Sequence, residues 1–138
     1  MIDSMEIEDI VWKKLDGSSL KSTITGKIRK KERPANSQLE DIVVNCLAVP
    51  NRQIQETIVN VNIFVPDIMR PENSVQEKVA NDARLKALYA IAEPLLKDVT
   101  VNGDTYFEIQ QQQVISDRPD SESHYINIRL FFYSANIN

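Results

Sequence analysis

Residues 124–133 alternate between two kinds of side chain, and this alternation constrains the fold more than any other feature of the sequence. One set is apolar: Ile126, Ile128, Leu130 and Phe132. The other set mixes polar and aromatic residues: Tyr125, Asn127, Arg129, Phe131 and Tyr133. Because successive side chains of a strand point to opposite faces of its sheet, the pattern predicts a strand with one face in the core. The second face is more aromatic than a solvent-exposed face needs to be, so we expect a helix or another subunit to cover it.

Three earlier segments are also predicted to be strands. Residues 22–33 end in a basic run, residues 39–48 are largely apolar, and residues 53–65 alternate. One face of the third segment carries four aliphatic residues: Val59, Val61, Ile63 and Val65. Turn-forming Pro, Asn and Ser residues separate the three segments. Such short connections predict an antiparallel meander of three consecutive strands.

Two segments have helical rather than strand periodicity. Near the N-terminus, Ser4 can cap a short helix, and Gly17 follows its last apolar residue, where a left-handed conformation commonly ends a helix. Ser74-Val75-Gln76-Glu77 has the pattern of a capping box and predicts a long helix that runs to about Lys97.

Length and composition favour one domain over residues 1–138, because 42% hydrophobic and 26% charged residues are ordinary for a soluble globular protein of this size. The predicted fold is α+β: an antiparallel sheet with a long helix on one face and a short N-terminal helix. The sheet combines the three-strand meander with a C-terminal hairpin, in which residues 106–115 pair with residues 124–133.

No apolar run approaches the roughly 18 residues of a membrane span. The first twelve residues carry four acids and no base, so we expect a cytoplasmic protein without a secretory signal.

The sequence offers little that could support catalysis or metal binding. Cys46 and His124 are the only cysteine and histidine, and 78 residues separate them. The adjacent carboxylates Glu40 and Asp41 would point to opposite faces of a strand and could not act together. Three widely spaced glycines exclude the usual phosphate-binding loops. We therefore expect no enzyme, cofactor or metal site, and a structural role for Cys46.

Charge is distributed unevenly along the chain. Residues 1–12 carry a net charge of −4, residues 13–33 carry +6, and the remaining residues carry −6. The basic run consists of Lys27, Arg29, Lys30, Lys31 and Arg33. Three interpretations are open: lysines that protect an edge strand from aggregation, a contact with the acidic surface of a second copy, or a contact with nucleic acid.

Three stretches carry a resemblance to a known family: RPANSQLEDIVVNCL (33–47), VNVNIFVPD (59–67) and SDRPDSESHYINIRLFFY (116–133). Together with the order helix, meander, helix and hairpin, they resemble the tail terminator and tail-completion (head-tail joining) proteins of long-tailed bacteriophages. The resemblance implies a structural protein of a virion or prophage, typically six copies in a ring that ends the tail tube and offers a surface to the head. Its implied partners are itself, the tail tube and head-connector proteins. The strongly basic first strand departs from many members, so the role of residues 27–33 stays open.

Two other classes of protein fit the same sequence, a standalone protein-binding or adaptor domain of an intracellular complex and an enzyme of another type. The structural ring subunit is favoured because no group of residues in the sequence forms a catalytic constellation. Its predicted interface combines the basic run with part of the last strand: Lys27, Arg29, Lys30, Lys31, Arg33, Tyr125, Arg129, Phe131 and Tyr133.

Overall fold

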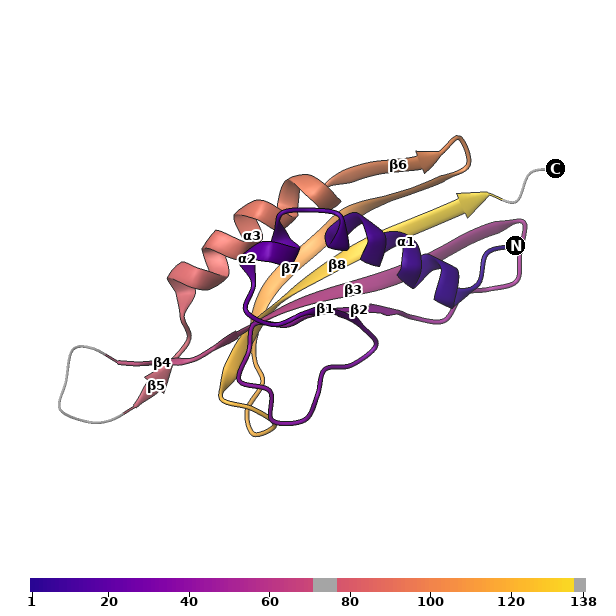
Figure 1. The fold of residues 1–138 in the computed structure, drawn as a ribbon. Helices are drawn as coiled ribbons and strands as arrows, with labels where there is room; N and C mark the ends of the chain where they lie inside the picture. Colours follow the sequence, from indigo (N-terminus) through magenta and orange to yellow (C-terminus); the bar gives the residue numbers. More distant parts are fainter. Residues whose placement is uncertain (71–76, 136–138) are drawn as a thin grey trace.

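The computed structural model describes residues 1–70 and 77–135, which form an α+β arrangement with a mixed, curled sheet (Figure 1). In chain order the elements are α1 (Ser4–Asp16), α2 (Leu20–Thr23), β1 (Ile28–Lys30), β2 (Ile42–Cys46), β3 (Ile54–Pro66), β4 (Ile68–Met69), β5 (Lys78–Val79), α3 (Asp82–Leu96), β6 (Asp98–Asn102), β7 (Thr105–Ser116) and β8 (Ser123–Ala135). Six strands form one sheet in the order β1-β2-β3-β8-β7-β6, and β4 pairs with β5. The predicted α+β class is confirmed.

The centre of the sheet is the antiparallel pair β3 and β8. Their register runs from Ile54 opposite Ala135 to Pro66 opposite Ser123. Within it Val61 lies opposite Ile128, and both side chains are fully buried. The two alternating apolar sets predicted from the sequence therefore meet on one face of the sheet and form its buried layer.

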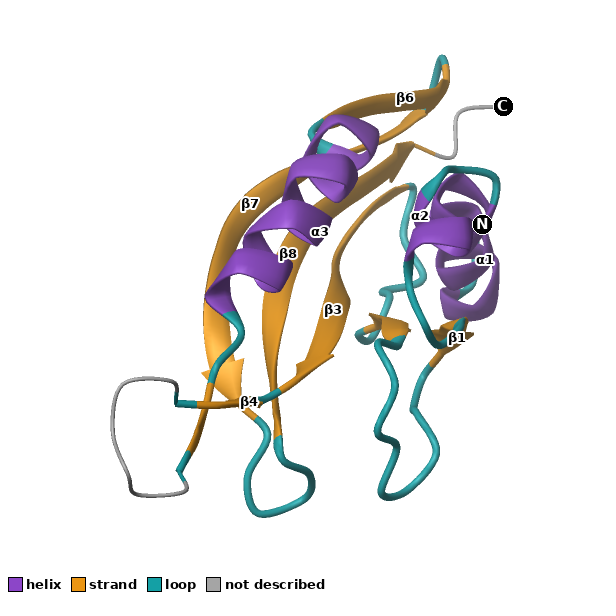
Figure 2. Cartoon of the chain, turned by 60° about the vertical axis from the view of Figure 1, so that its left-hand side comes forward, coloured by secondary structure: helices purple, strands orange, loops and turns teal. Residues whose placement is uncertain are grey.

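Helical side chains complete this core. The buried positions of α1 recur at helical spacing: Ile7, Val11 and Leu15. Those of α3 are Leu85, Leu88, Ala92 and Leu96. Both sets belong to one cluster with the apolar residues of the strands, and Figure 2 shows α3 beside β7 and β8, with α1 beside β1. Each fully buried Leu or Ile contributes about 1.5–3 kcal/mol relative to an exposed one.

Among the described residues, no helix combines the length and apolarity that crossing a membrane requires.

The prediction of a purely antiparallel sheet is wrong at its first strand. Ile28 of β1 lies opposite Ile42 of β2 in a parallel pair. Residues 31–41 form a wide loop that carries the chain back to the start of β1, and Lys31 and Asn36 take left-handed conformations in it, with φ of 71° and 58°. The predicted turn is thus only one bend of a longer return. The strand is also much shorter than residues 22–33, because α2 includes residues 20–23.

The long helix begins seven residues later than the capping-box pattern predicts. Residues 74–76 of that pattern lie outside the described residues, and Lys78 and Val79 immediately after it form β5, opposite Met69 and Ile68. The side chain of Asn81 caps α3 by accepting a hydrogen bond from the backbone N–H of Arg84 at 3.2 Å. Strand pairing with β4 therefore replaces the first predicted helical turns.

The N-terminal helix is present, but its ends differ in detail from the prediction. The carboxylate of Asp3, rather than the hydroxyl of Ser4, accepts the capping hydrogen bond from the backbone N–H of Glu6 at 2.8 Å. Gly17 has a φ of −79°, so this helix ends without the left-handed residue that the glycine led us to expect.

Two features of the C-terminal half were not predicted, the strand β6 and a bulge in β7. β6 forms a hairpin with β7 across the turn at residues 103–104 and pairs with Thr105–Glu108. A bulge at Gln110 then shifts the register between β7 and β8. After the bulge, Gln111 lies opposite Arg129 and Gln112 opposite Ile128. The simple alternation predicted for residues 106–115 is therefore wrong beyond Ile109, because one extra residue exchanges the two faces.

Candidate interaction surface

The sheet has a second face, which alternates with the core layer. We call it the open face. It consists of Glu56, Ile58, Asn60, Asn62 and Phe64 on β3, Tyr125, Asn127, Arg129, Phe131 and Tyr133 on β8, and Tyr106, Glu108, Gln111, Gln113 and Ile115 on β7. Phe64 is buried, and the others are half-buried or exposed. The hydrophobic core cluster of the described residues includes none of them.

One end of the open face is aromatic. The rings of Tyr106 and Tyr133 stack with centroids 5.1 Å apart, and the ring of Phe131 lies 6.5 Å from that of Tyr106. Tyr106 is 38% exposed. The structure thus brings together Phe131 and Tyr133 of the predicted interface. Tyr125 lies at the opposite end of β8, where its ring packs 4.7 Å from that of Phe64.

The middle of the open face is polar. The Asn127 amide donates hydrogen bonds to Asn60 Oδ1 at 3.1 Å and to Asn62 Oδ1 at 2.7 Å. Beside it, Arg129 lies opposite Asn60 on one strand and Gln111 on the other. The Nε atom of Arg129 is buried and has no hydrogen-bond partner among the described residues. A desolvated donor without an acceptor is unfavourable, so this position carries an energetic cost in the single chain.

The basic run lies against acids of the same chain. Lys30 pairs with Asp9 at 2.8 Å, and Lys31 pairs with Glu8 at 2.6 Å. Glu8 is only 2% exposed, and its second oxygen accepts a hydrogen bond from the backbone N–H of Cys46 at 3.0 Å. The acidic helix α1 therefore neutralises the lysines of the adjacent edge strand, a fourth role that the sequence analysis did not consider. No ion pair of Lys27 is found among the described residues.

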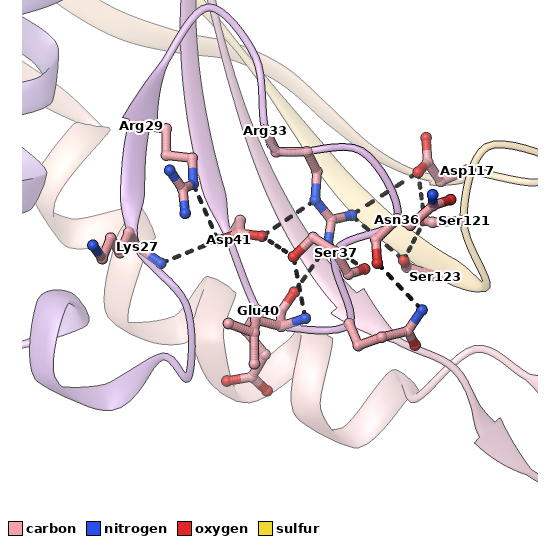
Figure 3. Close-up of polar contacts among 12 residues, drawn as sticks. Lys27, Arg29, Arg33, Asn36, Ser37, Glu40, Asp41, Asp117, Ser121 and Ser123 are labelled. Carbon is pink, nitrogen blue, oxygen red and sulfur yellow. Dashed lines mark hydrogen bonds and ion pairs between the residues drawn. The ribbon is translucent and has the colours of Figure 1, made fainter.

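The two arginines of the basic run converge on a buried carboxylate (Figure 3). Asp41 has a fully buried side chain that receives Arg29 Nε at 3.4 Å, Arg33 Nε at 3.3 Å and the Ser37 hydroxyl at 2.6 Å. The backbone N–H of Lys27 donates to it at 3.1 Å. Burial alone would raise the pKa of Asp41, but these donors and charges outweigh burial and hold the pKa below its ordinary value of 3.8. Asp41 therefore stays ionised and fixes the loop that precedes β2.

Arg33 extends this cluster to the far end of the open face. Its guanidinium lies 4.3 Å from the centre of the Phe64 ring and donates to the carbonyls of Ser37 and Leu39 at 3.1 and 3.0 Å. A cavity of about 290 Å³ lies between the loop that contains Arg33 and the loop at residues 117–121. The Arg33 side chain in its wall is 9% exposed and already paired, so the cavity presents no unpaired arginine to a ligand.

The structure separates the two residues considered as nucleophile and base. Cys46 pairs with Val59 and His124 with Val65, so their positions are offset by six residues along β3, or about 20 Å. His124 Nδ1 instead contacts the Asp67 carboxylate at 2.7 Å, which also receives Arg118 at 2.8 Å. Within residues 1–70 and 77–135, no group of three or more His, Cys, Asp or Glu side chains is arranged to hold a metal ion.

Cys46 is half-buried, and its burial raises the pKa of the thiol from 9.0 to about 11. Because the thiolate is the reactive form, we expect alkylation at pH 7–8 to be about 100-fold slower than for an unstructured cysteine peptide. A time course with iodoacetamide, followed by intact-protein mass, measures this rate. Denatured protein is the control and should react at the peptide rate. Native protein that reacts as fast as denatured protein would contradict the assignment of Cys46 as an inert structural residue.

The residues that sequence reasoning missed are Asp41 and its neighbour Glu40. The Glu40 carboxylate pairs with Arg84 of α3 at 2.6 and 2.8 Å, while Asp41 turns to Arg29 and Arg33. The available signal was two adjacent acids placed directly before a largely apolar strand, where a charge is buried and needs a partner.

Comparisons with known proteins assign no family to this arrangement. No protein-family model matches the sequence, and no curated relative was found.

Proposed function

We propose that this protein is a non-enzymatic structural subunit of a phage or prophage tail, in which copies associate through the open face to form a ring that ends the tail tube. The observation that carries the proposal is the aromatic end of the open face, with Tyr106, Phe131 and Tyr133 gathered where the core cluster does not reach. In this proposal the helices cover the core face of the sheet, and a second subunit covers the open face.

The composition of the open face supports a protein partner. Interfaces between subunits combine aromatic anchors and Arg with a polar surround, and they are depleted of Lys. Phe131 and Tyr133 would be the anchors, and Arg129 lies beside them with a buried donor that lacks a partner among the described residues. An acceptor on the neighbouring subunit would satisfy that donor.

Charge favours a second copy of this chain as the partner. Glu56 and Glu108 are exposed beside the aromatic residues, while Lys27 is exposed next to β1. A head-to-tail contact would bring these opposite charges together, and contacts of this kind close into rings. Nucleic acid is less well supported, because Lys30 and Lys31 are already paired with acids of α1.

The test is the double substitution Phe131→Glu with Tyr133→Glu. We expect it to weaken self-association at least about tenfold, because it buries charge without a partner in the contact. Light scattering at high protein concentration measures this association, and six copies of the 15.8 kDa chain would weigh about 95 kDa. Complementation of tail assembly in cells provides the second measurement, since a ring can require the tail tube as its template.

The matched control places the same two charges on exposed positions of α3, as Ala87→Glu with Ala90→Glu. This control should associate like the wild type and still complete tails. If the open-face variant folds, associates as strongly as the wild type and completes tails, the open face is not the interface and the proposal is wrong. If the wild type and both variants bind only an unrelated protein, the protein is an adaptor domain and not the subunit of a ring.

A further inference from the structure

The sheet edge formed by β6 and the second half of β7 has no strand partner among the described residues, and its longer part belongs to β7. β6 pairs with β7 only from Thr105 to Glu108, and the last bond on that side runs from Ile109 N to Lys97 O at 3.3 Å. From Gln110 to Ser116, β7 pairs with β8 on one side, and no other described strand lies on its second side. Figure 2 shows this part of β7 at the outer margin of the sheet. Every second backbone N–H and C=O group of the segment therefore has no strand to bond to.

The other edge of the sheet is closed. β1 has only three residues and is flanked by lysines. Its Ile28 carbonyl accepts a hydrogen bond from Trp12 Nε1 at 2.8 Å, and its Lys30 carbonyl accepts one from Glu32 N at 2.9 Å. Short length, charge and occupied backbone groups are the usual protection of edge strands. The segment Gln110–Ser116, with the sequence QQQQVIS, has no charged residue and no proline.

We propose that two copies of this chain pair edge to edge through Gln110–Ser116 of β7, antiparallel about a two-fold axis. A two-fold contact places the same segment opposite itself, so any charge in it would face a like charge. An uncharged segment avoids that repulsion, and identical glutamine side chains can exchange amide hydrogen bonds across the axis.

The bulge determines the register of this pairing. Beyond Gln110, the odd-numbered residues lie on the open face and the even-numbered ones on the core side. Residues opposite each other must share a face, and centring the free segment on the axis places Gln113 opposite its own copy. Gln111 then faces Ile115, and Gln112 faces Val114, which is 47% exposed in the single chain.

The ends of the free segment carry opposite charges. Asp98 and Glu108 are exposed acids at the end where β6 stops covering β7. Just beyond Ser116, the Arg118 side chain is 45% exposed, although its Nη2 atom donates to Asp67 at 2.8 Å and to the Lys78 carbonyl at 3.0 Å. In the centred register, the second copy's Arg118 approaches Asp98 and Glu108 at each end of the contact. This complementarity favours a second copy over an unrelated strand. The pairing does not depend on the proposed function, because it uses the backbone edge of β7. Gln111, Gln113 and Ile115 belong to both surfaces, so the test uses Gln112 and Val114, which lie on the core side of the segment.

The experiment compares two variants with opposite charge at the facing pair on the core side of the segment: Gln112→Lys with Val114→Lys, and Gln112→Glu with Val114→Glu. Both positions are exposed, so the variants should fold like the wild type. We expect sedimentation to show a monomer–dimer equilibrium for the wild type. For each variant alone, the protein concentration at which half of the chains are dimeric should be at least about tenfold higher. An equimolar mixture of the two variants should restore the dimer, with one chain of each kind by native mass spectrometry. Gln38→Lys with Gln53→Lys, at exposed positions outside β7, should dimerise like the wild type.

Three results would overturn the edge pairing: a wild type that stays monomeric to millimolar concentration, lysine variants that dimerise like the wild type, or a mixture that dimerises no better than its components. Repeating the series in the Phe131→Glu, Tyr133→Glu background separates the two surfaces. Edge dimers that persist there while larger assemblies are lost support both proposals. Larger assemblies that survive the open-face change but disappear with the edge change contradict only the proposed function.

Discussion

Replacing Asp41 with Asn is expected to lower the free energy of unfolding by about 3–4 kcal/mol, because it leaves a nearly buried guanidinium without its counter-ion. The carboxylate is fully buried between Arg29 and Arg33, and Arg33 itself is 9% exposed. Urea unfolding measures the change. The control is Asp16→Asn, which breaks a partly exposed pair with Lys21 at 3.4 Å and should cost about 0.5 kcal/mol or less. A loss below about 1 kcal/mol for Asp41→Asn would show that the cluster does not stabilise the fold.

The same variant has a signature in the pH dependence of stability. The pKa of Asp41 lies below its ordinary value of 3.8 in the folded protein, so the unfolded chain binds the proton more tightly. The stabilisation is therefore complete above that ordinary value and is lost as the pH falls through the lower folded pKa. We expect the stabilities of wild type and Asp41→Asn to differ most at neutral pH and to approach each other in strong acid. A constant difference across this range would contradict an ionised Asp41.

Gly26→Ala is expected to destabilise the protein by about 3 kcal/mol and to lower Tm by roughly 10 °C. A Cβ atom at this position would lie 2.3 Å from Asp41 Oδ1 and 2.5 Å from the Glu40 carbonyl oxygen. The backbone of Gly26 also donates a hydrogen bond to that carbonyl at 2.9 Å, so the two segments cannot separate without losing it. The φ of Gly26 is not positive, so a left-handed conformation is not the reason for a glycine here. The glycine is required because the β1 and β2 segments approach each other too closely for a Cβ atom.

Gly103→Ala is the matched control for this substitution. No heavy atom lies within 4 Å of a Cβ built at Gly103, which is exposed in the turn between β6 and β7. Differential scanning calorimetry should therefore show a Tm close to that of the wild type. Equal Tm values for the two alanine variants would mean that the β1 and β2 segments can move apart freely, and the account of Gly26 would fail.

The strands at the centre of the sheet could be predicted because their information is local. Val59, Val61 and Ile63 alternate with polar residues, and so do Ile126, Ile128 and Leu130, so each segment specifies by itself which side is buried. The two longer helices, α1 and α3, were predicted for the same reason, from apolar residues at helical spacing, whereas α2 was not predicted. Their ends were less accurate, since several residues compete for each cap and only one makes the hydrogen bond.

The candidate surface was predicted in part. Phe131 and Tyr133 belong to the aromatic end of the open face, as their alternation with the core set indicated, and Tyr106 joins them from β7. Pairing of Lys30 and Lys31 with Asp9 and Glu8 could not be predicted, because these ion pairs link residues more than twenty positions apart. Net charge along the sequence does not show which acid lies beside which base.

The sequence by itself determined the α+β class, the long central strands and the side of each that is buried, because side-chain alternation is a property of neighbouring residues. Only the tertiary structure decided that β1 runs parallel to β2, since a loop closed by Asp41 and Arg33 returns the chain to the start of its first strand. It also decided that β6 covers only the first part of β7, so that no described strand lies on the outer side of the rest, and that a bulge at Gln110 exchanges the faces there. These features depend on contacts between distant segments, and the energy of such contacts is not encoded in any local pattern of residues.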